Sequence, residues 1–409
     1  MKILCVLGKF NYGSALRGES YEYVNFLPAF RRLGHEVIFF DSLGRDTYRD
    51  FADLNRQFLD HVLFHDPDII FCSLMHYELW SETLQWVRNN THSILINWST
   101  DDSWKYRQFS ALIAENFHIY ATTYKTAMAS APGDGHSNFV LTQWAANSEN
   151  LIEPSRAIKC RYPVTFIGSA YGDRQQYVSS LQNRGIEVKC FGHGWERGAI
   201  PAADIPRIIN QSLISLNFGD SGLVMNGVKP TRSRQIKARI FEVPGAGGFL
   251  MTENADDLSD WYTAGKEIEV YEGISVLEDK IRYYLAHPEE RDAIAIAGHQ
   301  RTVAHHTYEM RFRGLLDRAA LLVTREKRYV KGAKSLLVDS FSQIEEQYKI
   351  GLVLRMLKWI LIFLCKALWG PGRGLRAARR ILFEISWRIM GKKTYSVSGW
   401  PGRLFYHES

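Results

Sequence analysis

Three polar residues near the middle of the chain have types and a spacing that suit nucleotide binding. Gln235, Arg239 and Glu242 lie three or four positions apart, so a helix predicted over Ser233–Phe241 would bring them onto one face. An arginine presents a fork of donors to a diphosphate, and a carboxylate can accept hydrogen bonds from the two hydroxyls of a ribose. The same spacing suits a surface ion pair between Arg239 and Glu242. The residues alone leave both interpretations open.

Two residues in the first half of the chain are candidates for a catalytic base. Asp101 follows the apolar run SILINWS, and His76 follows the run DIIFCSL. Side chains at the carboxyl end of a parallel strand face the side of the sheet where ligands bind. Either residue could remove a proton from an acceptor group. The alternative for Asp101 is capping of a following helix, a role that Thr100 could also fill.

A glycine-containing loop and a histidine pair complete the set of candidates. The segment GKFNYG, from Gly8 to Gly13, lacks the GxGxxG spacing of a dinucleotide site. Its glycines would let a ligand approach the backbone, or they form an ordinary tight turn. His305 and His306 are adjacent, so on a helix they would diverge by about 100° and could not readily bind one metal ion. We expect no metal ion and no other cofactor.

These candidates need a scaffold of parallel strands. Apolar runs alternate with amphipathic segments in two series, a pattern typical of α/β proteins with sheets covered on both faces. The first series is KILCVLG, EVIFFDS, DIIFCSL, SILINWS and HIYATTY, and the second is YPVTFIGS, EVKCFGH, ISLNFGD, GFLMTE and EIEVYE. We predict two Rossmann-like domains facing a cleft, over 1–155 and 156–325, a helical connector over 326–350 and a tail over 351–409.

Composition restricts the compartment and the partners. The 409 residues suffice for two cores, and the five scattered cysteines suggest neither a disulfide framework nor a zinc site, which favours a reducing cytoplasm. The first apolar run is too short for a signal peptide. The net charge is +6, but residues 351–409 carry eleven Lys and Arg against two Glu, or +9, which leaves −3 for residues 1–350.

The tail has the pattern of an amphipathic membrane-binding segment. Residues 351–369 approach the length of a membrane span but include Arg355, Lys358 and Lys366, whose burial at the bilayer centre is costly. After the GPGRG break, LRAARRILFEISWRIM has arginines on one side and apolar residues on the other. The pattern predicts helices lying in the interface of an anionic membrane. The alternatives are a true span, a helical hairpin packed on the body, and a nucleic-acid arm, which the apolar content disfavours.

An ordered series of motifs covers the second domain. It comprises Gln-x-Lys-x-Arg-x-Phe-Glu ending at Glu242, the turn GAGG, the strand LMTE, and then GKEI, YYLAHPEER and HTY. From about residue 160 to 318 the chain resembles the CgeB-like (spore-maturation) glycosyltransferases, which belong among the group 1-like enzymes of the GT-B fold. The resemblance implies a GT-B fold, with an N-terminal acceptor domain and a C-terminal donor domain.

The resemblance assigns roles to individual residues. Glu242 matches the acid that holds the ribose of the donor, and the segment FxGS…R matches a loop near the donor diphosphate. The residues expected to bind the donor are Glu242, Arg239, Gln235, Gly168, Ser169, Arg174, Gly247 and Gly248. Gly8 and Gly13 are expected to face the acceptor, with Asp101 and His76 as catalytic candidates. Many retaining relatives carry a second glutamate where this chain has Arg234, so the stereochemistry of transfer stays open.

The resemblance and the tail together predict a function. We expect a hexosyltransferase-like enzyme that moves a sugar from a nucleotide sugar to a glycan or lipid-linked acceptor. It would be peripheral at the cytoplasmic face of the cell membrane, bind anionic lipid through 351–409, and serve surface polysaccharide or glycolipid assembly, without a nucleic-acid partner. The alternatives are a nucleotide-sugar epimerase of the same fold and a non-catalytic surface or coat assembly protein.

Overall fold

The computed structural model describes residues 1–226, 229–323 and 341–407. It divides the chain into unit 1, Met1–Thr142 with Gly314–Ser409, and unit 2, Gln143–Arg313. The first boundary precedes the predicted residue 155 because residues 143–155 pack on unit 2, as in the hydrogen bond from the Ile152 amide to the Gly245 carbonyl. The tail belongs to unit 1. Residues 326–340 of the predicted connector lie outside the described residues.

Unit 1 is built on a six-stranded parallel sheet, in the order β2-β1-β3-β4-β5-β6. The strands are β1 (Lys2–Leu7), β2 (Glu36–Asp41), β3 (Ile69–Cys72), β4 (Ile94–Ser99), β5 (Ile119–Thr122) and β6 (Phe139–Leu141). The central strands are buried along their whole length, which explains why they read as continuous apolar runs. The five strands predicted in the first series are confirmed, and β6 is an addition.

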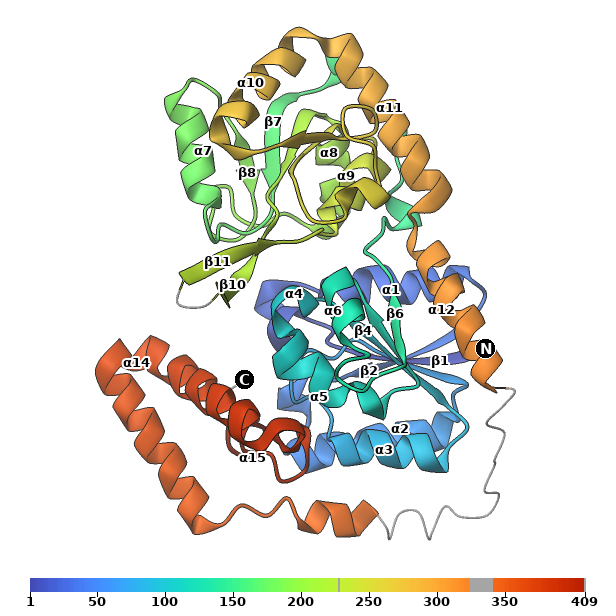
Figure 1. The fold of residues 1–409 in the computed structure, drawn as a ribbon, viewed down its shortest axis with the longest axis vertical. Coiled ribbons are helices and arrows are strands. Elements are labelled where there is room, and N and C mark those ends of the chain that lie inside the picture. Colours follow the sequence, from blue (N-terminus) through green and yellow to red (C-terminus); the bar gives the residue numbers. More distant parts are fainter. Residues whose placement is uncertain (227–228, 324–340, 408–409) are drawn as a thin grey trace. The chain divides into compact units, whose positions relative to one another are not determined.

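Helices cover both faces of this sheet. They are α1 (Tyr21–Arg32), α2 (Phe51–His65), α3 (Ser81–Asn90), α4 (Asp102–Lys105), α5 (Ala111–Ile113) and α6 (Lys125–Ser130). In Figure 1, α2 and α3 lie on the opposite side of the sheet from α1. Ser20 caps α1 by accepting the Tyr23 amide, and Asp50 caps α2 by accepting the Asp53 amide.

Unit 2 contains a second parallel sheet, in the order β13-β12-β9-β7-β8. Its strands are β7 (Tyr162–Ile167), β8 (Lys189–Phe191), β9 (Ser212–Asn217), β12 (Leu250–Glu253) and β13 (Glu269–Tyr271). An antiparallel pair, β10 (Asp220–Asn226) and β11 (Lys229–Arg234), is inserted after β9. The helices are α7 (Arg174–Asn183), α8 (Ile205–Asn210), α9 (Arg239–Gly245), α10 (Gly273–Ala286) and α11 (Pro288–His305), with α12 (Tyr308–Val323) leading into unit 1.

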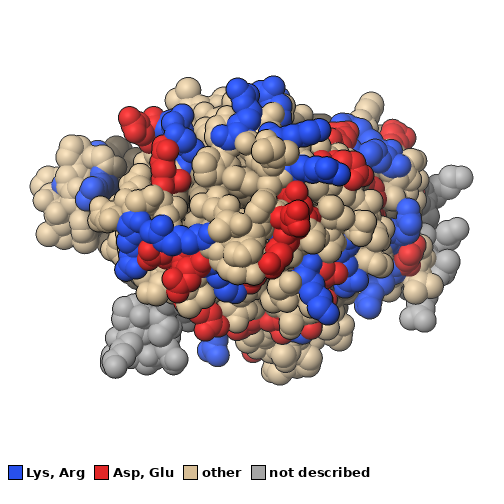
Figure 2. Space-filling view, turned by 90° about the horizontal axis from the view of Figure 1, so that it is seen from above, with Lys and Arg blue, Asp and Glu red and all other residues tan. Residues whose placement is uncertain are grey.

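The two units therefore have the predicted α/β architecture with two parallel sheets. On the face drawn in Figure 2, basic and acidic side chains are interspersed rather than gathered by sign. That face offers no continuous basic surface of the kind that tracks a nucleic-acid backbone.

The tail forms a helical hairpin. α14 (Leu352–Met390) is interrupted at Gly370, whose φ of 77° and ψ of 168° are non-helical. The two arms, 352–369 and 371–390, then approach closely, because a Cβ on Gly374 would lie 2.5 Å from the Cα of Lys366. Ile362 and Cys365 of the first arm, with Ala378 of the second, join a small core completed by α15 (Trp400–Phe405).

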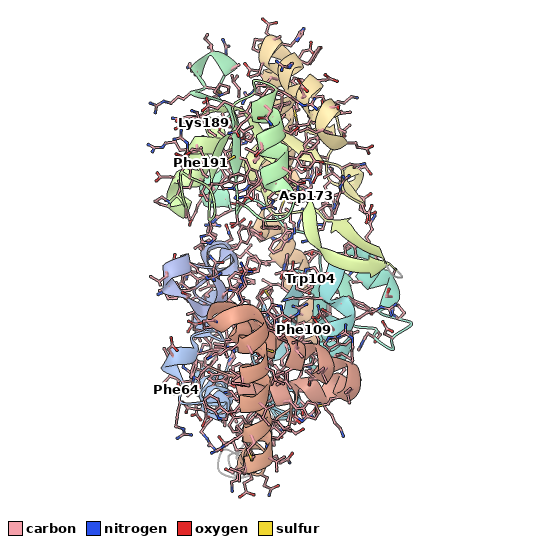
Figure 3. The ribbon with its side chains drawn as sticks, turned by 90° about the vertical axis from the view of Figure 1, so that its left-hand side faces the viewer. Phe64, Trp104, Phe109, Asp173, Lys189 and Phe191 are labelled. Carbon is pink, nitrogen blue, oxygen red and sulfur yellow. The ribbon has the colours of Figure 1, made fainter. Side chains whose placement is uncertain are left out.

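The second arm packs on unit 1. Phe383 and Tyr395 belong to the same core as the helices of the sheet. The Tyr395 ring lies 5.2 Å from Phe109, labelled in Figure 3, and its hydroxyl donates to the Gln108 carbonyl. Arg45 donates to the Tyr406 carbonyl at 2.8 Å. Of the alternatives open for the tail, a hairpin packed on the body is therefore the observed arrangement.

The first arm keeps an exposed apolar face. Trp359, Phe363 and Leu368 have 68%, 72% and 72% of their surface exposed. Within the described part of the chain, no helix combines the length and the low charge that crossing a membrane requires.

Candidate functional site

One arginine ties together two loops at the carboxyl edge of the unit 2 sheet. β7 is followed by Gly168 and Ser169, and its neighbour β9 is followed by Phe218. Arg174 is buried at the start of α7 and donates to the Ser169 carbonyl at 2.9 Å and to the Phe218 carbonyl at 3.5 Å. The structure thus brings Gly168, Ser169 and Arg174 together, with Arg174 positioning the loop.

Arg239 and Glu242 form an ion pair on α9. Nη1 of Arg239 lies 2.9 Å from Oε2 of Glu242, and the side chains are 19% and 20% exposed. The pair is therefore partly shielded rather than on an open surface. The arginine holds the carboxylate in place, while the remaining exposure leaves room for a ligand hydroxyl.

The predicted helix over Ser233–Phe241 is wrong at its start. The chain up to Arg234 pairs with β10 as strand β11, and α9 begins only at Arg239. Gln235 is buried, and its amide donates to the Gly219 carbonyl at 3.0 Å. Gln235 therefore lies at the carboxyl edge of β9 but shares no helical face with Glu242. Pairing with another strand has overridden the local helical pattern.

Glu253 is a residue of this edge that the sequence reasoning missed. It is buried at the end of β12, where Oε2 accepts the Gly219 amide at 2.8 Å and Oε1 lies 3.7 Å from Nη2 of Arg234. Arg234 stands where the sequence resemblance leads us to expect a second glutamate. The structure thus brings another carboxylate beside that position. The sequence feature that could have identified Glu253 is its position as an acid at the end of the apolar run GFLMTE.

Gly247 and Gly248 lie at the other edge of the sheet, because they follow α9 and precede β12. Gly247 has a φ of 72°, and a Cβ there would lie 2.4 Å from the Ile152 carbonyl oxygen. A Cβ on Gly248 would lie 2.5 Å from Ile209. These glycines are required by close packing of the chain itself, and their role in donor binding stays a prediction.

His306 has a structural environment. Its Nε2 lies 2.9 Å from the Trp261 carbonyl oxygen, and its Nδ1 lies 3.0 Å from Nη2 of Arg311. Burial lowers the pKa of His306 to about 4. Both ring nitrogens are thus engaged and the ring is neutral near pH 7. His305 is exposed. Among the described residues, no group of three or more His, Cys, Asp or Glu side chains is arranged to hold a metal ion.

Asp101 and Asp102, at the carboxyl end of β4, have different environments. Asp102 is buried and accepts hydrogen bonds from the hydroxyls of Ser99 at 2.7 Å, Thr122 at 2.6 Å and Ser110. Burial raises the pKa of Asp102 despite these hydrogen bonds. Asp101 precedes α4 and makes no capping hydrogen bond through its side chain. The capping role considered for its carboxylate is therefore not observed.

His76 lies in a strongly basic environment. Nζ of the buried Lys105 lies 3.4 Å from Nε2 of His76. A lysine ammonium can only donate, so Nε2 must be the acceptor and Nδ1 must carry the proton. Burial, followed by the charges of Lys105, Arg45 and nearby tail arginines, holds the pKa of His76 well below its usual range. In this arrangement His76 has no nitrogen left to accept a proton from a substrate.

Glu22 is a second missed candidate. It lies in the first turn of α1, near the carboxyl edge of the sheet. Burial, reinforced by the negative charges of Asp101 and Glu78, raises the pKa of Glu22 to about 7. Both carboxylate oxygens of Glu78 already accept hydrogen bonds, from the Met75 amide at 2.9 Å and from the Ser42 hydroxyl at 2.8 Å. A carboxyl group that titrates near neutrality can exchange protons with an acceptor.

The first loop supports the wall of a pocket. Gly13 has a φ of 72°, and a Cβ there would lie 2.5 Å from the Leu43 carbonyl oxygen. A Cβ on Gly8 would lie 2.6 Å from Cδ1 of Leu43. The two glycines let the loop after β1 approach the loop after β2. This approach fits the tight-turn interpretation and places Tyr12 at the mouth of the pocket.

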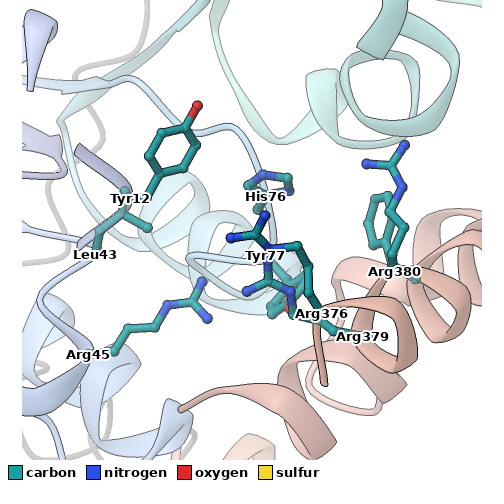
Figure 4. Close-up of a pocket in the computed structure, with 9 residues that line it drawn as sticks. Tyr12, Leu43, Arg45, His76, Tyr77, Arg376, Arg379 and Arg380 are labelled. Carbon is teal, nitrogen blue, oxygen red and sulfur yellow. The ribbon is translucent and has the colours of Figure 1, made fainter. Parts of the chain in front are cut away.

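The pocket of unit 1 has a volume of about 400 Å³ and is formed by loops of the sheet and by the second arm of the tail. Its lining residues are Tyr12, Leu43, Arg45, His76, Tyr77, Arg376, Arg379, Arg380 and Phe383. In Figure 4, Arg45 points from one wall toward Arg376 and Arg379 on the other. Of the predicted residues, His76 is in this lining; Asp101 and the glycines are not.

Comparisons with known proteins agree with this architecture. Residues 174–317 match the model of a family described as glycosyl transferase-like. No curated protein matches the sequence. Among solved structures, similar chains include sucrose-phosphate synthase from Thermosynechococcus elongatus, with 11% identity and a TM-score of 0.55 over 79% of this chain and 100% of that one.

Two further structures are similar at the same identity of 11%. A glycosyltransferase from Rickettsia africae has a TM-score of 0.52 over 80% of this chain and 99% of its own. HepE of Anabaena, solved in complex with UDP and glucose, has a TM-score of 0.54 over 78% and 99%. At this identity the likeness shows the fold. The chain has the GT-B fold of glycosyltransferases, with a C-terminal helical tail, as predicted.

Proposed function

We propose that the protein is a glycosyltransferase that transfers a sugar from a nucleoside diphosphate sugar to an acceptor presented at a membrane surface. The observation that carries the proposal is the partly shielded Arg239–Glu242 pair, in the segment that matches the glycosyl transferase-like model. The finer resemblance to CgeB-like enzymes and the transfer of a hexose are parts of this proposal.

Unit 2 would hold the donor. Glu242 would accept hydrogen bonds from the ribose hydroxyls, while Arg239 and the Ser169 loop would face the diphosphate. Gln235 would support this edge through its bond to Gly219. A leaving diphosphate can be stabilised by basic side chains and backbone amides without a metal ion, and we propose that no metal is required.

Unit 1 would bind the acceptor, with Asp101 as the general base. Its carboxylate is not used in a helix cap, whereas the Nε2 of His76 faces Lys105. We therefore favour Asp101 over His76 for proton removal and assign His76 to binding. Glu22 is the alternative general base, because its pKa of about 7 suits proton removal at neutral pH.

The first arm of the tail would bind a membrane. Its exposed Trp359 and Phe363 match the apolar side chains that enter the interface of a bilayer, and Arg355, Lys358 and Lys366 of the same arm would favour anionic lipid. We infer a peripheral protein of the cytoplasmic membrane face, active in surface polysaccharide or glycolipid assembly.

A nucleotide panel tests the proposal. The full chain is titrated with UDP, GDP, dTDP and CMP in a thermal-shift assay, since a ligand of the native state raises its stability. UDP is the first choice because HepE was solved with it. The corresponding nucleotide sugars are then assayed for hydrolysis. Conversion to an isomeric nucleotide sugar would favour an epimerase instead, and binding without turnover on any acceptor would favour a non-catalytic assembly protein.

A further inference from the structure

The pocket of unit 1 concentrates positive charge. Four of its nine lining residues are arginines and none is acidic. Arg376, Arg379 and Arg380 lie at i, i+3 and i+4, so they share one face of the second arm. The opposite wall contributes Arg45, which is buried. The arginine face of the tail, expected from the sequence to meet lipid, thus faces the N-terminal part of the chain instead.

Glu384 and Glu78, two acids outside the lining, also hold other groups. Glu384 lies 2.8 Å from Nη2 of the lining Arg380 and also pairs with Arg388, so its charge is shared between a lining arginine and an exposed one. Glu78 is directed to backbone amides and to Ser42. Burial is the main cause of the lowered pKa of Arg45; the charge of Arg379 lowers this pKa further, while Glu78 acts in the opposite direction. Like charges held close together cost free energy unless an anion joins them.

Converging guanidinium groups favour one class of anion. They present paired donors that match the oxygens of phosphate, and a phosphomonoester or diphosphate carries enough charge to offset several arginines. The neutral His76 and the hydroxyl-bearing Tyr77 add polar edges to the same lining. The volume of about 400 Å³ exceeds the need of a single phosphate and leaves room for the group attached to it.

We propose that this pocket binds the phosphomonoester or diphosphate group of the acceptor substrate. That the bound group belongs to the acceptor rests on the proposed function. That the pocket binds phosphate rests on its lining residues alone. The exposed apolar arm of the same hairpin indicates how such a group is presented. A phosphate borne on a lipid would reach the second arm while the first arm lies in the membrane.

The test measures binding of inorganic pyrophosphate to the full chain by calorimetry. The double variant R376Q/R379Q removes two lining charges. The control R355Q/R373Q removes two charges from exposed positions of the same tail that do not line the pocket. We expect the dissociation constant to rise by more than about tenfold in the first variant and to be unchanged in the control. Equal affinities in the two variants, or no binding to the native chain at millimolar pyrophosphate, would overturn the proposal.

A second experiment distinguishes a phosphate group carried on a lipid from one carried on a soluble acceptor. Vesicles of phosphatidylcholine containing phosphatidic acid, a phosphomonoester, are compared with vesicles of equal charge containing phosphatidylglycerol, a phosphodiester. A preference for the monoester that R376Q/R379Q abolishes supports a lipid-borne group. Pyrophosphate binding that depends on the arginines, without such a preference, supports a soluble phosphorylated acceptor. Donor nucleotide binding is measured on the same samples, so a failed pocket and a failed donor site are told apart.

Discussion

Asp101 and Asp102 are adjacent in the chain but differ in what their carboxylates contact. The Asp102 carboxylate accepts hydrogen bonds from three hydroxyl groups in the core. The Asp101 carboxylate follows the carboxyl end of β4 and makes no helix-capping hydrogen bond. We expect Asp101→Asn to lower kcat by about 10²- to 10⁴-fold, the usual effect of losing a general base. Its melting temperature should stay close to that of the native chain.

Asp102→Ala should have the opposite profile. Three buried hydroxyls would lose their acceptor, at a cost of about 1–3 kcal/mol or more in the free energy of unfolding. Denaturant unfolding checks the stability, and steady-state kinetics check the rate. A kcat unaffected by Asp101→Asn would remove that residue from catalysis and move attention to Glu22.

The pH dependence of stability should carry the signature of His306. Its pKa is about 4 in the folded chain and about 6.5 in the unfolded chain, so between these values the unfolded state binds more protons. Stability is therefore fully present above pH 6.5 and is lost as the pH falls toward 4, by up to about 3 kcal/mol. His306→Asn should flatten this part of the curve of unfolding free energy against pH. The exposed His305→Gln is the control, and identical curves for both variants would contradict the assignment.

Membrane binding should depend on the first arm of the tail. Deleting the whole tail is unsuitable, because Phe383 and Tyr395 complete the core of unit 1. The double variant W359S/F363S should instead weaken sedimentation with anionic vesicles by at least about tenfold, since each side chain contributes roughly 1.5–3 kcal/mol when buried. Phe64→Ser removes an aromatic side chain of α2, labelled in Figure 3, that is at least as exposed as these two, and should have no effect. Undiminished sedimentation of W359S/F363S would rule this arm out as the anchor.

The parallel sheets could be predicted from the sequence because buried strands read as uninterrupted apolar runs. The start of α9 could not, because β10 and β11 stabilise each other through pairing that helical spacing does not reveal. Gln235 therefore lies directly after β11 rather than on the helix that carries Glu242.

For a similar reason, the sequence could not predict what the arginine face of the tail contacts. An amphipathic pattern shows that Arg376 and Arg379 share a face, but not whether the partner of that face is lipid or protein. The kink at Gly370 and the packing of Phe383 decide it. Glu22 could not be singled out either, since its raised pKa arises from burial beside carboxylates that are distant in the chain.

The central claim is that Glu242 holds the donor nucleotide. Calorimetric titration of the nucleoside diphosphate selected by the panel tests it directly, on the native chain, on Glu242→Gln and on Glu187→Gln, an exposed acid of the same unit that pairs with Lys189. We predict that Glu242→Gln raises the dissociation constant by about ten- to a hundredfold, the effect of losing charged hydrogen bonds, while Glu187→Gln leaves it unchanged. Equal affinity for all three chains would contradict the assignment.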